Sequence, residues 1–511
     1  MFTVRRGRLA TPPASSARPA GCRLQIPRHL SICVALSLAI ALLAGVLALA
    51  MSAATVSVAL PSASPPNLMA LMAVQQTELT ASDGAASDEF GYSVAISGDT
   101  ALVGALHDTV GSNANQGSAY VFVRSGGSWT QQARLTASDG ATNNYFGYSV
   151  AISGDTALVG AYYATVSGKV AQGAAYVFVR SGTTWSQQTK LVAPDGAAGD
   201  LFGDSVAISG DTALVGAYYA DISGNSNQGA AYDFIRSGTS WAIQSKLWAG
   251  DGATNDNYGF SVALSGDTAL VGAPGKAVNG NSQQGAAYIL TRIGAGWTQA
   301  ELTVADGVAY DEFGQSVAVT GDTALVGAPF ATVGTHYGQG AAYVFTGSVT
   351  SWSQQAKLTA NDGQSNNYGG WSVALTGQEA LVGAKAATAG AAGNEGAAYL
   401  FVRSGTTWSQ KVKLGAGDGA AWDDFGSSVA LSGWTALVGA HLHTVGANSH
   451  QGSAYPFLLD TIGPTTTGHG LAADNNSGWA NQTVTASLSA IDDVSGVAAT
   501  YYTLDGGGQQ T

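Results

Sequence analysis

Large and small side chains alternate in short runs along most of the chain, and the runs come in groups of four. In the first group, segment 90–98 alternates with a period of two, which predicts a β-strand. Its large residues are expected on one face: Phe90, Tyr92, Val94 and Ile96. A Gly-Asp turn leads to a second predicted strand at 100–105, and segments 117–124 and 129–137 predict two more. No segment of this group has the 3.6-residue period of a helix.

The dipeptide Ser-Val marks seven copies of this four-stranded unit, 55 or 56 residues apart: Ser93, Ser149, Ser205, Ser261, Ser316, Ser372 and Ser428. Four short strands in about 55 residues is the size of a propeller blade. A two-sheet sandwich would place polar residues on one face of each strand, whereas these strands carry Ala, Gly and Ser there. The sequence therefore predicts an all-β fold, a seven-bladed β-propeller over residues 74–459.

The two ends of the repeat region complement each other. The seventh copy passes from its third predicted strand, 452–459, into segment 460–464 and has no fourth strand. The missing pattern stands at the other end, where segment 74–81 matches segment 130–137. We expect segment 74–81 to complete the last blade and close the ring, which removes exposed sheet edges.

The units resemble FG-GAP repeats, the building blocks of the integrin α-subunit head and of many bacterial secreted proteins. Phe-Gly is literal in five copies and varies at 258–259 and 369–370, and Gly-Ala-Pro is literal at 272–274 and 327–329. Other residues replace the proline elsewhere: Leu106, Tyr162, Tyr218, Lys385 and His441. Some integrin-like repeats place a calcium loop between the first two strands. Here that connection has four residues, too few for six to eight oxygen ligands, so the resemblance is to calcium-loop-less repeats.

The first 53 residues differ from the rest of the chain. They contain six arginines and no acidic residue, and segment 30–51 is almost wholly apolar. This pattern predicts a signal peptide or, because the apolar run is long, an uncleaved signal anchor, with a linker at 54–73. Both alternatives export the chain, so the expected location is secreted or at the cell surface. Any membrane contact is expected only through this anchor.

Charge and cysteine usage restrict the partners. Both cysteines, Cys22 and Cys33, lie in the leader, so no disulfide, thiolate nucleophile or cysteine metal site is expected after it. Without the six leader arginines the chain has 14 basic residues against 33 acidic ones, a net charge of −19. Such a surface repels nucleic acid and anionic lipid. The expected partner is an extracellular protein or a carbohydrate, and the propeller is expected to be monomeric.

Asp-Gly opens all seven loops between units, and a second polar residue follows five positions after the aspartate. Examples are Asp83 with Asp88 and Asp195 with Asp200. The favoured interpretation is a turn in which the aspartate binds its own backbone amides and the glycine adopts positive φ. The alternative is a weak divalent-cation site in each loop.

The seventh unit is the least regular, with three histidines in its long loop. His441 and His443 are two residues apart, a spacing that allows both rings to point the same way and hold a metal; the alternative is a solvated loop. A catalytic site needs residues that the other units lack, and no such constellation stands out. We expect no enzyme activity, catalytic residue or cofactor. Six of the units repeat a tryptophan that is expected to pack, with sugar stacking as the alternative.

The loops between the second and third strands vary most, and variable loops on a rigid scaffold usually carry recognition. The predicted function is therefore an exported binding or adhesion scaffold. The alternatives are a secreted propeller enzyme, a glycan hydrolase or lyase, and a structural protein of an envelope array. Residues 460–511 resemble a bacterial Ig-like module, with predicted strands at 478–491 and 501–506, but they are too few for a whole sandwich. An incomplete module is expected.

Overall fold

The computed structural model describes residues 72–349, 351–390, 393–460, 465–469 and 487–491. These residues form strands, turns and loops and contain no helix. Accordingly, none of the described segments is a helix able to span a membrane. The chain divides into two units, 1–68 and 69–511. The predicted leader, 1–53, and nearly all of the linker, 54–73, lie outside the described residues.

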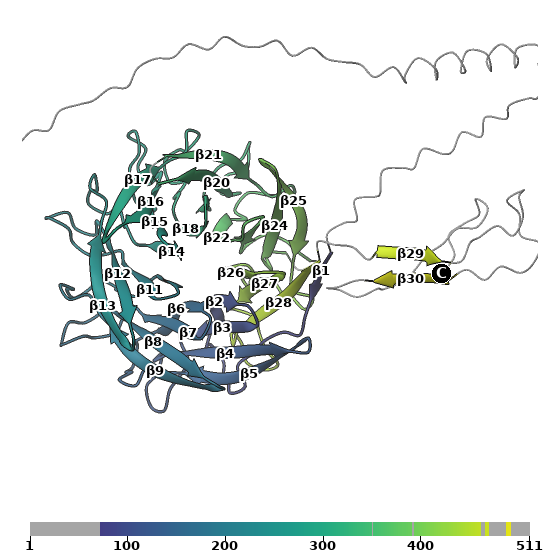
Figure 1. Ribbon diagram of the computed structural model, residues 1–511, viewed down its shortest axis with the longest axis horizontal. Helices are drawn as coiled ribbons and strands as arrows, with labels where there is room; N and C mark the ends of the chain where they lie inside the picture. Colours follow the sequence, from purple (N-terminus) through teal and green to yellow (C-terminus); the bar gives the residue numbers. More distant parts are fainter. Residues whose placement is uncertain (1–71, 350, 391–392, 461–464, 470–486, 492–511) are drawn as a thin grey trace, which may run out of the picture. The chain divides into compact units, whose positions relative to one another are not determined.

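Seven four-stranded antiparallel sheets form a closed ring, with the first strand of each blade nearest the centre (Figure 1). The strands of blades 1 and 2 are β2 (Phe90–Ser97), β3 (Thr100–Ala105), β4 (Ser118–Ser125), β5 (Ser128–Leu135), β6 (Phe146–Ser153), β7 (Thr156–Ala161), β8 (Ala174–Ser181) and β9 (Thr184–Leu191). Those of blades 3 and 4 are β10 (Val206–Ser209), β11 (Thr212–Ala217), β12 (Ala230–Ser237), β13 (Ser240–Leu247), β14 (Ser261–Ser265), β15 (Thr268–Ala273), β16 (Ala286–Ile293) and β17 (Gly296–Leu302). Those of blades 5 and 6 are β18 (Ser316–Thr320), β19 (Thr323–Ala328), β20 (Ala341–Ser348), β21 (Ser351–Leu358), β22 (Gly369–Leu375), β23 (Glu379–Ala384), β24 (Ala397–Ser404) and β25 (Thr407–Leu414).

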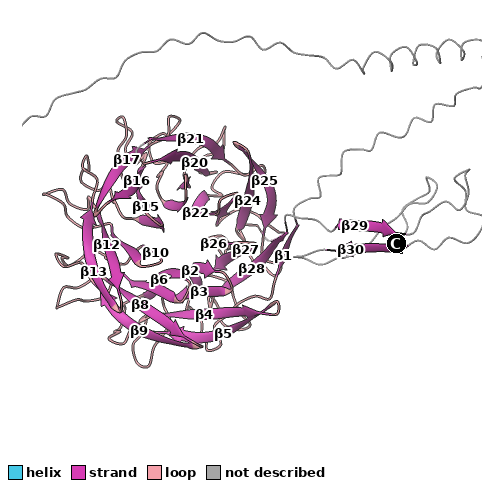
Figure 2. Ribbon diagram, viewed as in Figure 1, coloured by secondary structure: helices cyan, strands magenta, loops and turns pink. Residues whose placement is uncertain are grey.

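Blade 7 is completed by the N-terminal strand, as the sequence predicts. Its strands are β26 (Ser428–Ser432), β27 (Thr435–Ala440), β28 (Ser453–Asp460) and β1 (Met72–Gln75), in that order across the sheet (Figure 2). β1 pairs antiparallel with β28, and a further bridge joins Leu79 to Ala454. Trp129 of blade 1 donates a hydrogen bond to Gln76 at 3.0 Å, just as Trp185 of blade 2 donates to Gln132 at 2.9 Å. The incoming segment therefore occupies the fourth-strand position.

The serines of the Ser-Val dipeptides join neighbouring blades. Each hydroxyl donates to the carbonyl oxygen of the Phe-Gly glycine, or its equivalent, in the next blade, at 2.7 to 2.8 Å. The pairs are Ser93–Gly147, Ser149–Gly203, Ser205–Gly259, Ser261–Gly314, Ser316–Gly370, Ser372–Gly426 and Ser428–Gly91. The last pair joins blade 7 to blade 1, so the same contact runs around the whole ring.

The second strand carries a glycine where this contact brings two backbones together. A Cβ atom on Gly104 would lie 1.9 Å from the carbonyl oxygen of Gly147 and 2.4 Å from Oγ of Ser93. Real Cβ atoms do not approach backbone so closely, so any side chain here would push two blades apart.

The first strand departs from the predicted alternation. Phe90 pairs with Ala105 and Ser93 pairs with Gly104, so two residues, including Tyr92, bulge out of the ladder. Phe90 is fully buried in the sheet core, whereas Tyr92 lines the centre of the ring. The expectation that Phe90 and Tyr92 share one face is therefore wrong. A bulge adds residues to one strand and redirects the side chains beyond it.

The hydrophobic core lies between blades. One cluster, for example, joins Leu102 and Val121 of blade 1 to Phe146, Val159 and Tyr176 of blade 2. The repeated tryptophans pack against the clusters as partly buried side chains, which confirms their packing role: Trp129, Trp185, Trp241, Trp297, Trp352 and Trp408.

After the propeller, β29 (Thr465–His469) pairs antiparallel with β30 (Ser487–Ile491). The predicted strand at 478–491 is described only over 487–491, and the one at 501–506 lies outside the described residues. The Ig-like module stays a prediction.

We expect Leu79→Ala to destabilise the propeller by about 2–5 kcal/mol, because Leu79 is 3% exposed in the cluster that joins blades 7 and 1. The control is Val74→Ala on the same segment, because Val74 is 40% exposed and should change stability by less than about 0.5 kcal/mol. Urea unfolding followed by tryptophan fluorescence measures both. Equal, small effects would show that the N-terminal segment does not close the ring.

We expect Gly104→Ala to lower the free energy of unfolding by about 1–3 kcal/mol or more, because the new methyl group collides with the neighbouring blade. Gly250→Ala is the matched control, since a Cβ there meets nothing within 4 Å. It should be neutral or slightly stabilising. The same urea experiment tests this pair, and a tolerated Gly104→Ala would refute the close-approach argument.

Candidate functional site

One residue from each blade lines the central channel, at the position that follows Phe-Gly: Tyr92, Tyr148, Asp204, Phe260, Gln315, Trp371 and Ser427. In blades 1, 2 and 6 the bulge in the first strand takes this residue out of the ladder. Together with Lys385 and His441, these side chains line a cavity of about 530 Å³. We call this site the channel mouth.

Lys385 and His441 stand where other repeats have the proline of Gly-Ala-Pro. The Lys385 ammonium lies 3.3 Å from the ring centroid of Trp371. The His441 ring lies 5.2 Å from that of Tyr92, and its Nδ1 is 3.0 Å from the hydroxyl of Ser427. Residues that depart from the repeat pattern thus gather in one place.

Burial shifts the pKa values of the ionisable side chains at the channel mouth. It raises the pKa of Asp204 to about 8, although a hydrogen bond from Tyr148 opposes the rise. One carboxyl oxygen of Asp204 has no hydrogen-bond partner among the described residues. Burial also lowers the pKa of His441 to about 4, so its imidazole is neutral near pH 7. The pKa of Lys385 falls through burial as well, opposed by Asp424 at 4.0 Å.

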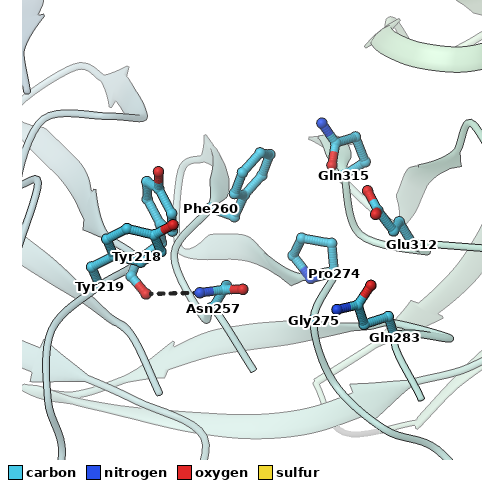
Figure 3. A pocket seen from close by; sticks show the side chains of 9 residues that line it. All are labelled: Tyr218, Tyr219, Asn257, Phe260, Pro274, Gly275, Gln283, Glu312 and Gln315. Carbon is cyan, nitrogen blue, oxygen red and sulfur yellow. Dashed lines mark hydrogen bonds between the residues drawn. The ribbon is translucent and has the colours of Figure 1, made fainter. Parts of the chain in front are cut away.

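A second, smaller hollow of about 260 Å³ adjoins the channel mouth and shares Phe260 and Gln315 with it (Figure 3). The amide of Asn257 donates to the backbone oxygen of Tyr218 at 3.4 Å in its wall. Tyr219 is 41% exposed at this hollow. The two hollows share part of their aromatic and amide walls, and we call them together the recess.

The interblade loops and the loops between second and third strands lie together on the face around this recess. Backbone hydrogen bonds join interblade loops to the loops between second and third strands, for example Trp422 to Asn394 and Tyr310 to Ser282. These loops carry several exposed aromatic residues: Tyr163, Tyr219, Tyr310, Tyr337 and Trp422. The face is therefore rich in aromatic surface.

The structure changes part of the interpretation of the Asp-Gly turn between blades. The Asp195 carboxylate accepts hydrogen bonds from Tyr232 at 3.0 Å and from Lys246 at 2.6 Å, in addition to its own backbone amide. Burial alone would raise the pKa of Asp195, but these bonds lower it. Asp200 caps the turn by accepting from the Ala197 amide at 2.8 Å, and burial raises its pKa.

The glycine of Asp-Gly does not adopt the positive φ that the sequence suggested. In every interblade loop except that of Gly419, a side chain there would meet a glutamine instead; a Cβ on Gly196, for example, would lie 2.6 Å from the side-chain amide of Gln172. In the first loop Asp83 pairs with Arg134 at 2.9 Å. Asp88 accepts from the Ala85 amide at 2.6 Å, and burial raises its pKa to about 6.

A Lys or Arg side chain contacts the interblade aspartate in six blades: Arg134–Asp83, Lys190–Asp139, Lys246–Asp195, Lys276–Asp251, Lys357–Asp306 and Lys413–Asp362. In these six loops the first aspartate thus has a protein cation as its partner, and the loop-cation hypothesis stays a prediction.

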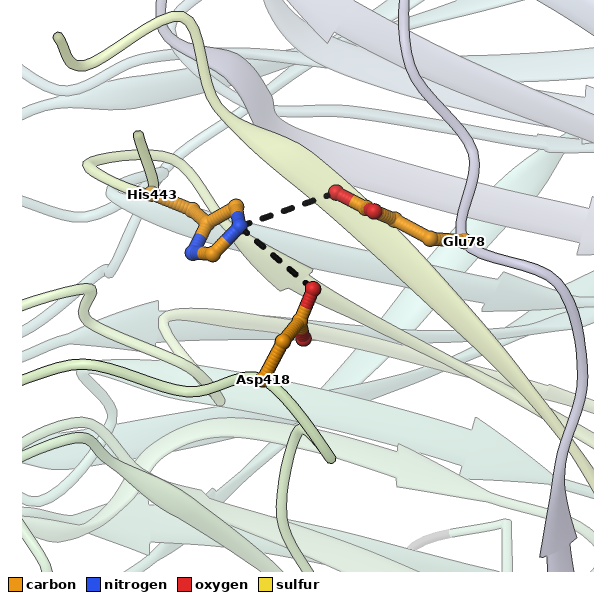
Figure 4. Close-up of side chains that lie close together, drawn as sticks. All are labelled: Glu78, Asp418 and His443. Atoms are coloured by element: carbon orange, nitrogen blue, oxygen red, sulfur yellow. Dashed lines mark ion pairs between the residues drawn. The ribbon is translucent and has the colours of Figure 1, made fainter. Parts of the chain in front are cut away.

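His441 and His443 do not contact the same groups. His441 lies in the channel mouth, whereas Nδ1 of His443 is 2.7 Å from Asp423 and its Nε2 faces Glu78 and Asp418 (Figure 4). The structure does not bring the two histidines together at one site. Glu78 and Asp418 were not singled out beside His443 in the sequence.

Sequence reasoning also missed the channel mouth. A usable signal was present, because the residue after Phe-Gly differs between blades while the following Ser-Val is constant in all seven.

These features define a closed seven-bladed propeller built from one repeated unit. The model of the FG-GAP repeat family matches seven consecutive segments: 73–122, 129–178, 185–234, 241–290, 297–345, 352–401 and 408–457. The matches cover more than half of the chain, which therefore belongs to the FG-GAP repeat family. A search of curated proteins found no match. A propeller of FG-GAP repeats suggests a binding or scaffold role.

We expect the stability of the protein to fall with rising pH in a way that Asp204→Asn removes. The folded state holds the Asp204 proton up to about pH 8, whereas the unfolded value is 3.8. The protonated Asp204 side chain therefore contributes its full stabilisation below pH 4 and loses it as the pH rises to 8. Over this range the free energy of unfolding should fall by about 1.4 kcal/mol per pH unit relative to the Asp204→Asn variant. Urea unfolding at several pH values measures the difference. Gln315→Ala, in the same ring, is the non-titrating control, and a pH-independent difference for Asp204→Asn would contradict the assignment.

Proposed function

We propose that the protein is an exported, non-catalytic binding module that recognises an extracellular protein or glycan with the face around the channel mouth. The observation that carries this proposal is the distribution of sequence differences between blades. Positions that join blades are nearly constant, such as the serine of Ser-Val and the glycine at Gly104. Two positions line the channel mouth, the residue after Phe-Gly and the residue after Gly-Ala, and both vary between blades.

The chemistry of the recess supports a binding role. Its volume falls in the range of ligand sites, which combine apolar walls with a few polar groups. Tyr and Trp side chains bury large apolar area at low entropic cost and dominate binding energies at interfaces. Trp371 and Tyr92 offer such surfaces inside the recess, and Asp204 and Gln315 offer hydrogen-bonding groups.

Export is supported by the N-terminal sequence. The arginine-rich leader, the apolar segment 30–51 and the small residues after it are the parts of a secretory signal. The acidic remainder of the chain also fits an extracellular ligand better than nucleic acid.

A glycan hydrolase that cleaves ester groups on a glycan is the second candidate, and the Ser427–His441 contact of 3.0 Å is the observation that favours it, because a Ser–His pair attacks acyl groups. Nucleophilic catalysis by such a pair requires a base with a pKa near the working pH and a third group that orients it. Burial lowers the pKa of His441 to about 4, and no hydrogen bond links its ring to a carboxylate among the described residues. Binding is therefore the better supported role.

Glycan and protein arrays probed with the full chain test the proposal. We expect reproducible binding, and Trp371→Ala should weaken it at least about tenfold because it removes the largest aromatic surface of the recess. Trp434→Ala is the matched control. Trp434 is 44% exposed in the turn between β26 and β27, at the opposite end of its blade, so its loss should change affinity less than about twofold.

Three outcomes would contradict the proposal. Binding unaffected by Trp371→Ala would place the site elsewhere. Turnover of a bound glycan that Ser427→Ala abolishes would establish the enzyme. Self-assembly into ordered arrays without ligand binding would establish a structural envelope protein.

A further inference from the structure

Blade 4 shows how an acidic residue at the end of the fourth strand is neutralised. Glu301 stands where most blades have Lys or Arg, and a compensating Lys276 appears in the loop after the second strand. The Lys276 ammonium lies 2.9 Å from Asp251 and 3.6 Å from Asp256. Glu301 is close enough to raise the pKa of Lys276, together with both aspartates and against the effect of burial.

Blade 7 has the same acidic residues but no ammonium among them. Glu78 corresponds to Glu301, and Asp418 and Asp423 correspond to the two aspartates. The place of the lysine is taken by His443, which is 7% exposed. No Lys or Arg pairs with these carboxylates among the described residues.

We propose that Glu78, Asp418 and His443 bind one divalent transition-metal ion at this position. Nε2 of His443 is 3.8 Å from Oε1 of Glu78 and 3.7 Å from Oδ2 of Asp418 (Figure 4). These separations are too long for hydrogen bonds, but they suit ligands that share an ion about 2.0–2.2 Å from each. One donor atom from each residue lies within 4.8 Å of the other two.

The surroundings of His443 orient it as a ligand. Its Nδ1 is 2.7 Å from the Asp423 carboxylate, and this contact directs Nε2 toward Glu78 and Asp418. Metal-binding histidines usually donate their other ring N–H to a carboxylate in this way. Asp423 is itself held by the Ala420 amide at 2.7 Å, so the orienting group is fixed by the loop.

Tyr455 packs beside the proposed ligand His443. It is fully buried, and its ring lies 6.0 Å from that of His443. An ion with three protein ligands keeps a fourth position for water.

The donor set favours zinc and related first-row ions, because it combines one imidazole nitrogen with two carboxylate oxygens. The ligands come from three segments: Glu78 from the segment that completes blade 7, Asp418 from the loop between blades 6 and 7, and His443 from blade 7 itself. A bound ion ties the N-terminal segment to the blade it closes. The site is separate from the channel mouth and does not depend on the proposed binding function.

Zinc titration of the full chain tests the proposal. Cys22 and Cys33 are replaced by serine in every variant, so that their thiolates do not contribute, and bound metal is first removed with EDTA. Isothermal titration calorimetry should show one zinc site that His443→Lys abolishes. That variant recreates the arrangement of blade 4, so its fold and its metal-free unfolding temperature should be preserved. Zinc should raise the unfolding temperature of the parent protein but not that of His443→Lys.

Two further variants sharpen the result. Lys276→His converts blade 4 to the blade 7 arrangement and should add a second zinc site. Asp423→Asn should weaken zinc binding by about 10–100-fold. It should keep the loop intact, because Asn144 and Asn367 make the same backbone contact in other blades. No zinc binding tighter than millimolar by the parent protein, or equal binding by His443→Lys, would overturn the proposal.

Discussion

The hydrogen bond from a serine hydroxyl to the Phe-Gly carbonyl of the next blade sets the spacing of the whole ring. In the first blade Ser93 reaches Gly147 at 2.8 Å, and this distance is possible only because Gly104 lets the two backbones approach. The same bond closes the ring between Ser428 and Gly91. Since every blade interface uses this geometry, the residues that form it are nearly invariant between repeats, and a side chain at Gly104 would disturb two blades at once.

This constraint also explains where the chain is free to vary. The residue after Phe-Gly leaves the β-ladder and faces the channel, so it makes no contact on which the blade spacing depends. Asp204 and Trp371 therefore occupy equivalent positions with unrelated chemistry. A rigid ring of equal blades thus presents an unequal set of side chains at its centre, which is the arrangement that specific recognition requires.

The sequence predicts the strands, the number of blades and the closure, because each is encoded by local spacing or by the match of segment 74–81 to segment 130–137. It does not predict the bulge at Tyr92, because a period-two pattern does not show where pairing slips. The cluster of Glu78, Asp418 and His443 was missed for a different reason. Glu78 and His443 lie at opposite ends of the repeat region and meet only after the ring has closed.

The closing blade differs physically from the other six. In those blades a short turn joins the third and fourth strands, as between β4 and β5, and the covalent link makes their pairing nearly local. In blade 7 the fourth strand arrives from the far end of the repeat region, so its pairing bears the entropy of closing the whole loop. Contacts between Glu78 and its neighbours therefore stabilise the strand pairing whose partners lie farthest apart in the sequence. An ion that binds only the closed ring would favour closure by mass action, whereas an ion held within another blade would not join the two ends of the repeat region.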